Sequence, residues 1–407
     1  MTTPHDILLC QRFLPEMGGS IRWMYEVYRR WSGPVDVITH DYFDHPPCTP
    51  EFPDKPVRPE SGDVVTDANL RMDRQDIFMR DWGLENPGRL LRYLRMTHAV
   101  RKRLGMHRDK VVRVHAIHAV PEVVSLLPLK QLYGKRLKVL CYVHGEEVTA
   151  CRTSRQLTLL MKQAHRMIDV MIANSQYTAQ VVEPYMEGKP VTVINPGVKL
   201  DEFADAVQAG AALREERGWK DRLIVLTVGR LDPRKNQGTV IEAVGKLVER
   251  YPNLLYLIAG EGRNRNRWEE KVSAAGLEKH VQFLGSVDGA IKRALYGACD
   301  VFAMPAVRDG SDVEGFGMVF LEAAACGKPS IAGNTGGQAD AVRNGETGLI
   351  VDGMDVREVT LALDRLLADE ATRKTMGEAG CNHAQNFDWP KVVEKVHTLA
   401  DNMIVDG

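Results

Sequence analysis

The sequence predicts an α/β protein with two doubly wound, Rossmann-like domains. Short apolar runs such as DILLC and LLYLIA alternate along the chain with longer amphipathic runs, and this alternation favours parallel sheets covered by helices on both faces. The 407 residues are too many for one ordinary domain and suit two or three. We expect one domain over residues 1–198, a second over 199–385, and a C-terminal helix over 386–407 that packs back towards the first.

Composition excludes several classes of protein. The net charge of -1 gives no argument for a nucleic-acid partner. The seven cysteines are scattered and lack a C-x-x-C pair, which indicates a reducing compartment without a zinc site or a disulfide framework. We see no signal peptide in MTTPHDILLCQRF and no apolar run of about 18 residues. We expect a cytoplasmic protein and leave open peripheral attachment to the inner face of the membrane.

The first predicted strand, DILLC, is followed by FLPEMGGS and by the helical run IRWMYEVYRRW. A strand, a turn at Gly18 and Gly19, and a helix form an architecture that lets a phosphate approach the backbone. The dinucleotide fingerprint G-x-G-x-x-G is missing, which disfavours nicotinamide binding. An ordinary turn with two glycines is the alternative. After the strand VDVIT, residues 44–60 carry six prolines and predict a long irregular loop.

Residues 88–110 predict a basic amphipathic helix. The segment holds eight Lys or Arg residues and one acid, Asp109. Leu90, Leu91, Leu94 and Val100 have helical apolar spacing. Such a helix can lie on an anionic membrane surface or hold an acceptor phosphate. The alternative is a solvated face of an ordinary helix.

Three further strands complete the first half, in RLKVLCYVHGEEV, IDVMIANSQYTAQVV and VTVINPGV. The first of them ends at His144. The carboxyl ends of parallel strands are where open α/β sheets bind ligands. His144 is therefore a candidate to donate to a ligand hydroxyl, with a purely structural histidine as the alternative.

The second half opens with the strand and loop RLIVLTVGRLDPRKN, which precede the helix QGTVIEAVGKLVERYP. Arg230 and Lys235 are cations five residues apart at the carboxyl end of that strand, an arrangement that suits a diphosphate. Strands and helices continue to alternate through LLYLIAGEG, RWEEKVSAAGL, VQFLG, AIKRALYGAC and DVFAMPA, and then through KPSIAG, GLIVDG and VREVTLALDRLLAD. We expect the strand ends of the two domains to face each other across a cleft that holds a ligand.

Residues 312–327, DVEGFGMVFLEAAACG, combine a glycine turn with two carboxylates. We interpret Gly315 and Gly317 as a turn that opens a helix, with Glu314 at the turn and Glu322 about two turns inside. The unpaired N–H groups of such a turn suit a phosphate. The carboxylates accept hydrogen bonds from hydroxyls, which a ribose and a hexose both supply. The combination suggests a nucleotide-sugar site, and a buried helix with two solvent-facing glutamates is the alternative.

Taken together, these motifs resemble a known family. GRLDPRKN, IAGEG, EGFGMVFLEAAACGKPSIAG and NGETGLIV occur in the order seen in retaining glycosyltransferases of family 4, which have the GT-B fold. FLPEMGGS, HGEEV, ANSQYT and INPGV extend the resemblance over nearly the whole chain. FAMPA followed by DVEGFGMVFLEA is especially similar to the subgroup with GDP-mannose-dependent phosphatidylinositol mannosyltransferases.

The resemblance implies a role for each candidate residue. Arg230 and Lys235 would hold the donor diphosphate, and Glu314 would contact hydroxyls of the transferred sugar. His144 resembles the active-site histidine of the family, near the reacting face of the sugar. These four residues form the expected catalytic set.

The remaining donor contacts follow from the same resemblance. Glu322 would hold the nucleotide ribose, and backbone groups would contact the donor at Gly18, Gly19, Gly315, Phe316 and Gly317. With two cations on the diphosphate, we expect no metal and no cofactor.

The chain departs from the family pattern at two places near the donor. Many members have glycine after the lysine of the R-x4-K motif, where this chain has Asn236. Many have Glu in a GG-x-P-E turn, where this chain has Gln338, Ala339 and Asp340. These departures leave the preferred base and sugar open.

The resemblance implies retaining transfer of a hexose from a nucleoside diphosphate donor to an acceptor hydroxyl, in glycolipid or cell-surface polysaccharide synthesis. Mannose from GDP-mannose is favoured, and a UDP-sugar is the alternative donor. The acceptor would be lipid-linked or saccharide-linked. Two other functions stay open: a GT-B nucleotide-sugar 2-epimerase and a non-catalytic sugar-nucleotide-binding subunit.

Overall fold

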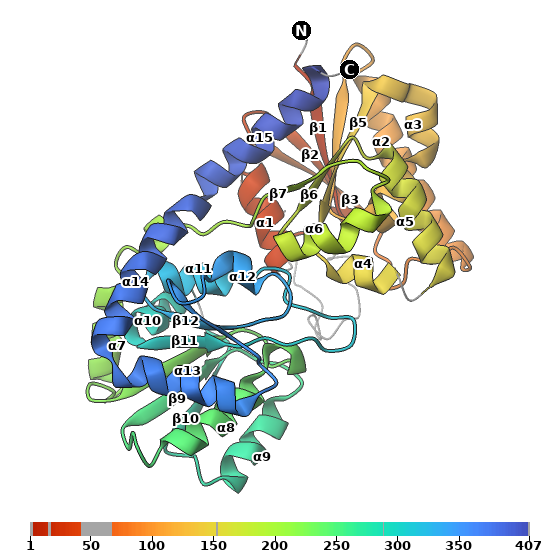
Figure 1. The fold of residues 1–407 in the computed structure, drawn as a ribbon. Helices are drawn as coiled ribbons and strands as arrows, with labels where there is room; N and C mark the ends of the chain where they lie inside the picture. Colours follow the sequence, from red (N-terminus) through yellow and green to blue (C-terminus); the bar gives the residue numbers. More distant parts are fainter. Residues whose placement is uncertain (1–2, 15–17, 42–66, 152–153, 288, 406–407) are drawn as a thin grey trace. The chain divides into compact units, whose positions relative to one another are not determined.

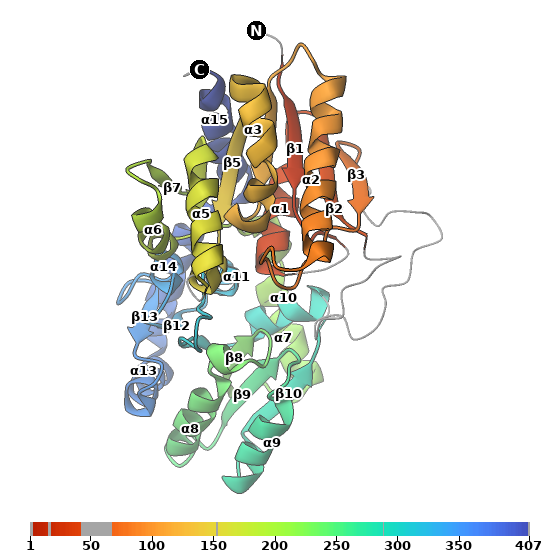
Figure 2. The same ribbon diagram turned by 90° about the vertical axis from the view of Figure 1, so that its right-hand side faces the viewer.

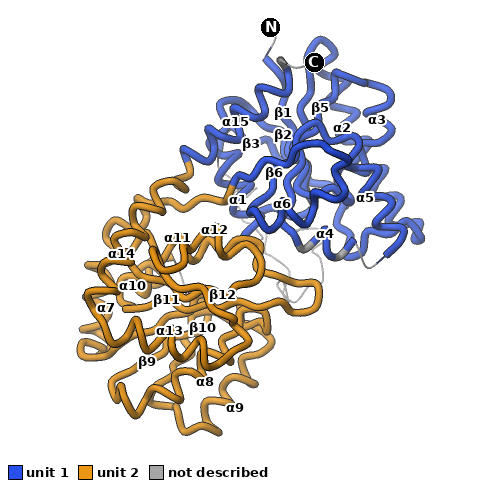
Figure 3. Tube along the Cα trace, viewed as in Figure 1, with its two compact units in different colours: residues 1–194, 390–407 blue, residues 195–389 orange. Residues whose placement is uncertain are grey.

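The structure is a computed structural model that describes residues 3–14, 18–41, 67–151, 154–287 and 289–405. It divides into two compact units, which Figure 3 shows in different colours. Unit 1 holds residues 1–194 and 390–407, and unit 2 holds residues 195–389. The segment 386–389 lies in unit 2, where the backbone N–H of Val198 donates to the carbonyl of Phe387 at 2.8 Å. The expected proline-rich loop over 44–60 is outside the described residues.

Unit 1 is built on a parallel seven-stranded sheet with the order β3-β2-β1-β4-β5-β6-β7. Its strands are β1 (His5–Leu9), β2 (Val35–His40), β3 (Leu70–Gln75), β4 (Val112–Ala116), β5 (Leu137–Val143), β6 (Val170–Ala173) and β7 (Val191–Val193). β1 and β4 are buried along their whole length, as expected for central strands covered on both faces.

The helices of unit 1 cover both faces of this sheet (Figures 1 and 2). They are α1 (Gly19–Tyr28), α2 (Pro87–Met106), α3 (Leu127–Tyr133), α4 (Glu146–Cys151), α5 (Arg155–Met167), α6 (Gln176–Val182) and α15 (Trp389–Val405). α2, α3 and α5 share one apolar core with the sheet, and α1 and α15 lie on the opposite face.

The C-terminal helix α15 is tied to unit 1 by charged groups. Arg113 of β4 donates to Asp6 of β1 at 2.6 and 2.8 Å and to Asp401 of α15 at 2.6 Å. His397 stacks on Trp31, with ring centroids 4.2 Å apart, and lies 2.7 Å from the hydroxyl of Ser32. The end of the chain is therefore a structural part of the first unit.

Unit 2 repeats the architecture with a parallel six-stranded sheet in the order β10-β9-β8-β11-β12-β13. Its strands are β8 (Leu223–Val228), β9 (Leu254–Ala259), β10 (Val281–Gly285), β11 (Val301–Met304), β12 (Ser330–Gly333) and β13 (Gly348–Val351). Its helices are α7 (Ala206–Glu216), α8 (Gln237–Leu247), α9 (Arg265–Ala274), α10 (Gly289–Ala298), α11 (Met318–Ala325), α12 (Gln338–Ala341), α13 (Val356–Ala368) and α14 (Glu370–Ala384).

Alternate residues of β8 enter two separate cores on the two faces of the unit 2 sheet. Ile224 and Leu226 pack with α7, α10 and α11, whereas Val225 packs with α8, α9 and α13. Each unit is thus an open α/β sheet covered on both faces, and the predicted fold class is confirmed.

Both sheets reverse their strand order at a defined point. In unit 1 the reversal falls between β1 and β4, and in unit 2 it falls between β8 and β11. Open α/β sheets bind ligands outside the carboxyl ends of the strands at this switch point. The loops after β1, β8 and β11 carry Gly18, Arg230 and Glu314 respectively, so these three of the expected site residues lie on the loops that this rule selects.

Candidate functional site

The loop after β8 presents the first two candidate cations. Arg230 and Asp232 form an ion pair at 3.3 Å, and the Arg230 side chain is 54% exposed. A 3₁₀ turn over Pro233–Lys235 follows and leads into α8. Lys235 is mostly buried and contacts Glu314. The two cations predicted to share one diphosphate therefore differ in exposure and in their present partners.

Asn236 stands where many members of the family have glycine, and its backbone conformation shows why both residues fit there. Its backbone is left-handed, with φ 61° and ψ 32°, a conformation that glycine adopts freely and that asparagine tolerates better than most residues. Its side-chain amide donates to the carbonyls of Pro305 and Gly353 at 2.9 and 2.7 Å. Asparagine thus supplies the required backbone conformation and also ties the loop to the end of β11.

Glu314 is the centre of a charge cluster that we call the Glu314 cluster: Glu314, Lys235, Arg234 and Asp312. The first three side chains are mostly buried, and that of Asp312 is 44% exposed. Arg234 Nη1 donates to Glu314 Oε2 at 2.6 Å, and Lys235 Nζ contacts the same oxygen. Arg234 Nε also lies 3.1 Å from Asp312 Oδ1. Both cation contacts reach Oε2, and among the described residues neither of these cations contacts Oε1.

The cluster keeps Glu314 ionised. Burial alone would raise the pKa of Glu314, but the charges of Lys235 and Arg234 outweigh burial and hold the pKa below its ordinary value. At neutral pH the carboxylate is therefore a pure hydrogen-bond acceptor. The sequence analysis named Glu314 and Lys235 but missed Arg234. The only signal for it was its position beside Lys235 in PRKN.

Two glycines shape the backbone around Glu314. Gly317 is the N-cap of α11 with φ 94°, in the left-handed region. At Gly336, a Cβ would lie 2.2 Å from the carbonyl oxygen of Glu314, and the next residue, Gly337, donates its N–H to that carbonyl at 2.8 Å. The Gly336-Gly337 turn thus allows the backbone to approach the Glu314 peptide closely.

Glu322 lies inside α11, and its surroundings differ from those of Glu314. Because α11 begins at Met318, Glu322 lies just over one turn inside the helix, and the expectation of two turns was wrong. Lys292 of α10 donates to Glu322 Oε1 at 2.8 Å, and the Tyr296 hydroxyl donates to Oε2 at 2.8 Å. The two glutamates therefore belong to separate polar clusters, one with the loop after β8 and one with α10.

Gln338, at the second departure from the family pattern, is a structural residue. It is fully buried. Its Oε1 accepts from the N–H groups of Gly333 and Ala306 at 2.8 and 3.2 Å, and its Nε2 donates to the carbonyls of Ala306 and Thr335. All four hydrogen bonds hold backbone segments together, so this amide supports the site without facing a ligand.

In unit 1, α1 begins at the predicted glycine turn. Gly18 is the N-cap of α1 in an extended conformation, and Gly19 is the first helical residue. A Cβ built at Gly18 meets no atom within 4 Å. Neither backbone strain nor packing among the described residues requires glycine at position 18.

His144 follows β5 at the carboxyl edge of the unit 1 sheet. Its ring lies against Trp23 and His118, with centroids 5.5 and 5.6 Å away. Burial, together with repulsion from His118, lowers the pKa of His144 to about 3, so the ring is neutral at physiological pH. Its Nε2 atom is buried and has no hydrogen-bond partner within the described part of the chain.

His118 is a neighbour of His144 that the sequence analysis missed. It follows β4, lies 3.4 Å from the buried carboxylate of Glu122, and is partly exposed. Its signal was the same as that of His144, a histidine directly after a buried strand, in VRVHAIH.

α2 forms much of the basic segment 88–110. Asp76 pairs with Arg92 and Arg95, and Asp36 and Asp73 pair with Arg103. The exposed cations Arg101 and Lys102 have no ion pair to any described residue.

The apolar residues named from the sequence divide between two faces of α2. Val100 is buried, whereas Leu90, Leu91 and Leu94 are 47%, 49% and 54% exposed. Among the described helices, none combines the length and the hydropathy needed to cross a membrane.

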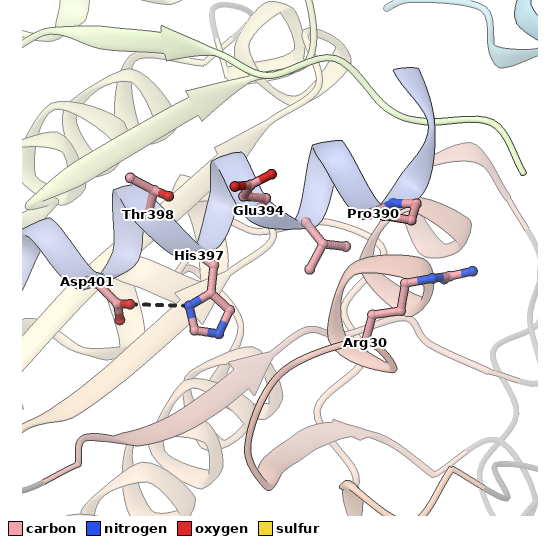
Figure 4. A pocket seen from close by; sticks show the side chains of 7 residues that line it. Arg30, Pro390, Glu394, His397, Thr398 and Asp401 are labelled. Carbon is pink, nitrogen blue, oxygen red and sulfur yellow. Dashed lines mark hydrogen bonds and ion pairs between the residues drawn. The ribbon is translucent and has the colours of Figure 1, made fainter. Parts of the chain in front are cut away.

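A separate pocket of about 490 Å³ lies in unit 1 beside α15 (Figure 4). Arg30 lines it from the segment after α1, and Glu394, His397 and Asp401 line it from α15. None of these residues was predicted as a site residue.

Both halves of the chain match known family profiles. The profile of Glycosyl transferases group 1 matches residues 210–383, and that of Glycosyltransferase Family 4 matches residues 17–202. The GDP-mannose-dependent alpha-(1-6)-phosphatidylinositol monomannoside mannosyltransferase of Mycolicibacterium smegmatis is 35% identical over 275 residues, which cover 67% of this chain and 72% of that protein.

A second relative comes from Corynebacterium glutamicum. Its GDP-mannose-dependent monoacylated alpha-(1-6)-phosphatidylinositol monomannoside mannosyltransferase is 34% identical over 270 residues, which cover 64% of this chain and 69% of that protein.

Solved structures agree in fold over nearly the whole chain. HepE of Anabaena in complex with UDP aligns with a TM-score of 0.76 and 18% identity, covering 98% of this chain and 100% of that one. Sucrose-phosphate synthase of Thermosynechococcus elongatus aligns with a TM-score of 0.75 and 22% identity, covering 100% of both chains. By its sequence relatives and its fold, the chain belongs to glycosyltransferase family 4 and is a glycosyltransferase with the GT-B fold.

Proposed function

We propose that the chain transfers a hexose from a nucleoside diphosphate donor to an acceptor hydroxyl, with retention at the anomeric carbon. The observation that most strongly supports this proposal is the Glu314 cluster at the switch point of unit 2. It places an ionised, buried carboxylate beside a cation that can turn to a phosphate, at the N-terminal end of α11. GDP-mannose is the favoured donor because the relatives from M. smegmatis and C. glutamicum are named as GDP-mannose-dependent.

In this proposal Arg230 and Lys235 bind the donor diphosphate. The guanidinium of Arg230 is 54% exposed on the loop after β8, which makes it accessible to a phosphate. Cleavage of the sugar–phosphate bond adds negative charge to the leaving diphosphate. Two cations and the N-terminal end of α11 stabilise that charge in the transition state.

Glu314 and Glu322 bind different parts of the donor. Glu314 Oε1 accepts hydroxyl hydrogen bonds from the sugar while Oε2 stays paired with Arg234. Backbone groups at Gly315, Phe316 and Gly317 contact the donor beside it. Glu322 accepts from the ribose hydroxyls near Lys292.

Unit 1 supplies the remaining proposed contacts. The unpartnered Nε2 of His144 suits a hydrogen bond to the transferred sugar near its reacting carbon. A Cβ at Gly18 would meet no described residue within 4 Å, and this open space supports close approach of the donor phosphate at Gly18 and Gly19. The leaving phosphate accepts the proton of the acceptor hydroxyl, so no protein nucleophile is needed.

We further propose a lipid-linked acceptor and a membrane-facing surface on α2. Leu90, Leu91 and Leu94 expose apolar area, and helical spacing continues their stripe to Arg101 and Lys102. Exposed leucines next to unpaired cations suit the interface of an anionic membrane. Such attachment would place the enzyme on the inner face of the membrane.

Product analysis tests the proposed function. The purified chain is incubated with GDP-mannose or UDP-glucose, together with vesicles that contain phosphatidylinositol mannosides, and the products are identified by NMR. A retaining transferase releases the nucleoside diphosphate and forms an α-linked product from the α-linked donor. A 2-epimerase changes the sugar but leaves it on the nucleotide, and a binding subunit leaves both donors unchanged. Either of the last two results would contradict the proposal.

A further inference from the structure

Arg234 is the least exposed cation of the Glu314 cluster, and none of the expected roles includes it. Its side chain is 5% exposed, against 13% for Lys235 and 54% for Arg230. Its backbone carbonyl accepts from the N–H of Val307 at 2.9 Å, which fixes the 3₁₀ turn to the loop after β11. Arg234 is therefore held in place on both its backbone and its side chain.

Lys235 has two proposed partners, Glu314 and the donor diphosphate. Lys235 contacts Glu314, so a diphosphate that binds this lysine competes with the carboxylate for the same ammonium group. A buried carboxylate that loses its only cation is strongly destabilised. Glu314 would face that penalty at the moment the donor arrives if Lys235 were its only partner.

Arg234 removes this penalty because it binds the same oxygen. Its Nη1 lies 2.6 Å from Glu314 Oε2. When Lys235 turns away, the carboxylate keeps one charged hydrogen bond and its orientation. Asp312 forms an ion pair with the other side of the guanidinium, with 3.1 Å between its Oδ1 and Arg234 Nε.

We propose that Arg234 is a positioning residue that releases Lys235 for the donor diphosphate while it holds Glu314 in place for the sugar. This inference rests on the proposed function, because it assumes that Lys235 binds a diphosphate. It assigns Arg234 no contact with the substrate. Its effect on nucleotide binding passes through Glu314, and that dependence can be tested by removing the carboxylate.

The test measures nucleotide affinity by calorimetry in a cycle of four proteins: wild type, Arg234→Gln, Glu314→Gln and the double variant. The probe is GDP or UDP, whichever binds the wild type more tightly. Since neither probe carries a sugar, Glu314→Gln is expected to bind it at least as tightly as the wild type. In Arg234→Gln the lysine stays trapped on Glu314, and affinity is expected to fall about tenfold. In the double variant nothing traps the lysine, and affinity returns to within about threefold of the wild type.

Rescue by Glu314→Gln is the result that a purely structural role of Arg234 would not produce. If the double variant binds as weakly as Arg234→Gln, the inference is wrong. Lys235→Gln separates this failure from failure of the proposed function. If Lys235→Gln binds the nucleotide as tightly as the wild type, the diphosphate role itself is wrong.

Two further variants control for folding. Arg214 forms an ion pair with Asp300 at 2.6 Å elsewhere in unit 2, so Arg214→Gln removes a comparable ion pair away from the site. It is expected to leave nucleotide affinity unchanged. If Arg234→Gln does not fold, Arg234→Lys replaces it in the cycle, since lysine keeps the charge but loses the fixed fork of arginine. If Arg234→Lys lowers nucleotide affinity, adding Glu314→Gln must restore it. If the affinity is not restored, the inference is wrong.

Discussion

The hydroxyl of Tyr296 lies 2.8 Å from Oε2 of Glu322, and both side chains are buried in unit 2. Lys292 contacts the other oxygen of the same carboxylate. The acid that we assign to the ribose is thus held from both sides. Two side chains of α10 therefore fix the direction in which the Glu322 oxygens can accept further hydrogen bonds. The family motif does not include α10.

Tyr296→Phe tests this arrangement. Loss of a buried hydrogen bond to a charged group should lower the free energy of unfolding by about 1–3 kcal/mol, measured in denaturant. Nucleotide affinity should fall as well, because Glu322 loses its fixed orientation. Tyr256→Phe is the matched control, since it also loses a buried hydroxyl contact, 2.7 Å to Thr227, but lies outside the proposed site. Equal nucleotide affinities in the two variants would contradict the role of α10.

The partly buried side chain of His144 predicts a pH dependence of stability. The pKa of His144 is lowered to about 3, below its ordinary value of 6.5, so the unfolded chain binds the proton more tightly than the folded one. Stability should therefore fall as pH drops below about 6.5 towards 3. Between pH 7 and pH 5 this residue alone should lower the free energy of unfolding by roughly 2 kcal/mol.

Denaturant unfolding of the wild type and His144→Gln at both pH values isolates that contribution. The variant cannot titrate at this position, so it should lose less stability on acidification. Identical losses in the two proteins would show that His144 is not buried in its neutral form.

Gln338→Glu should destabilise unit 2. A carboxylate can replace the amide as acceptor from Gly333 and Ala306, but it cannot donate to the carbonyls of Ala306 and Thr335. Leaving buried groups unsatisfied next to a buried charge should cost about 2–4 kcal/mol in denaturant unfolding. Gln282→Glu, at an exposed position of β10, is the control and should change stability little. A stability loss no larger than that of the control would contradict the structural role of Gln338.

Membrane attachment through α2 predicts a loss of vesicle binding. Replacing Leu90, Leu91 and Leu94 with serine should reduce co-sedimentation with phosphatidylcholine vesicles that contain phosphatidylglycerol. Exposed apolar area and nearby cations act together in such binding. Leu361→Ser, which changes an exposed leucine of α13, should have no effect. Unchanged binding of the triple variant at low salt would remove α2 as the membrane surface.

The sequence sufficed for the fold because the local signals agree. Apolar runs bounded by glycines and prolines mark the strands, and their alternation with helices leaves few topologies. Arg230, Lys235 and Glu314 could be proposed for a related reason: they lie on loops that follow strands, where a parallel sheet brings chain segments of different sequence position to one edge.

The partners of these residues could not be predicted in the same way. Glu314 and Arg234 are 80 positions apart in the chain, and Glu322 and Tyr296 are 26 apart. Nothing in either local pattern specifies which buried carboxylate a given arginine or tyrosine will reach. The sequence left open whether Leu90, Leu91 and Leu94 face the core or the solvent, because helical spacing identifies an apolar stripe but not what the stripe faces.

In the donor site that we propose, Glu314 binds the sugar and Glu322 binds the nucleotide. The most direct test measures GDP affinity and GDP-mannose turnover for Glu314→Gln and Glu322→Gln. Glu314→Gln is expected to bind GDP as well as the wild type while its kcat/KM falls about a hundredfold or more, because its defect appears only when sugar is present. Glu322→Gln is expected to lose GDP affinity itself. Full turnover by Glu314→Gln, or equal losses of GDP affinity in both variants, would contradict the account.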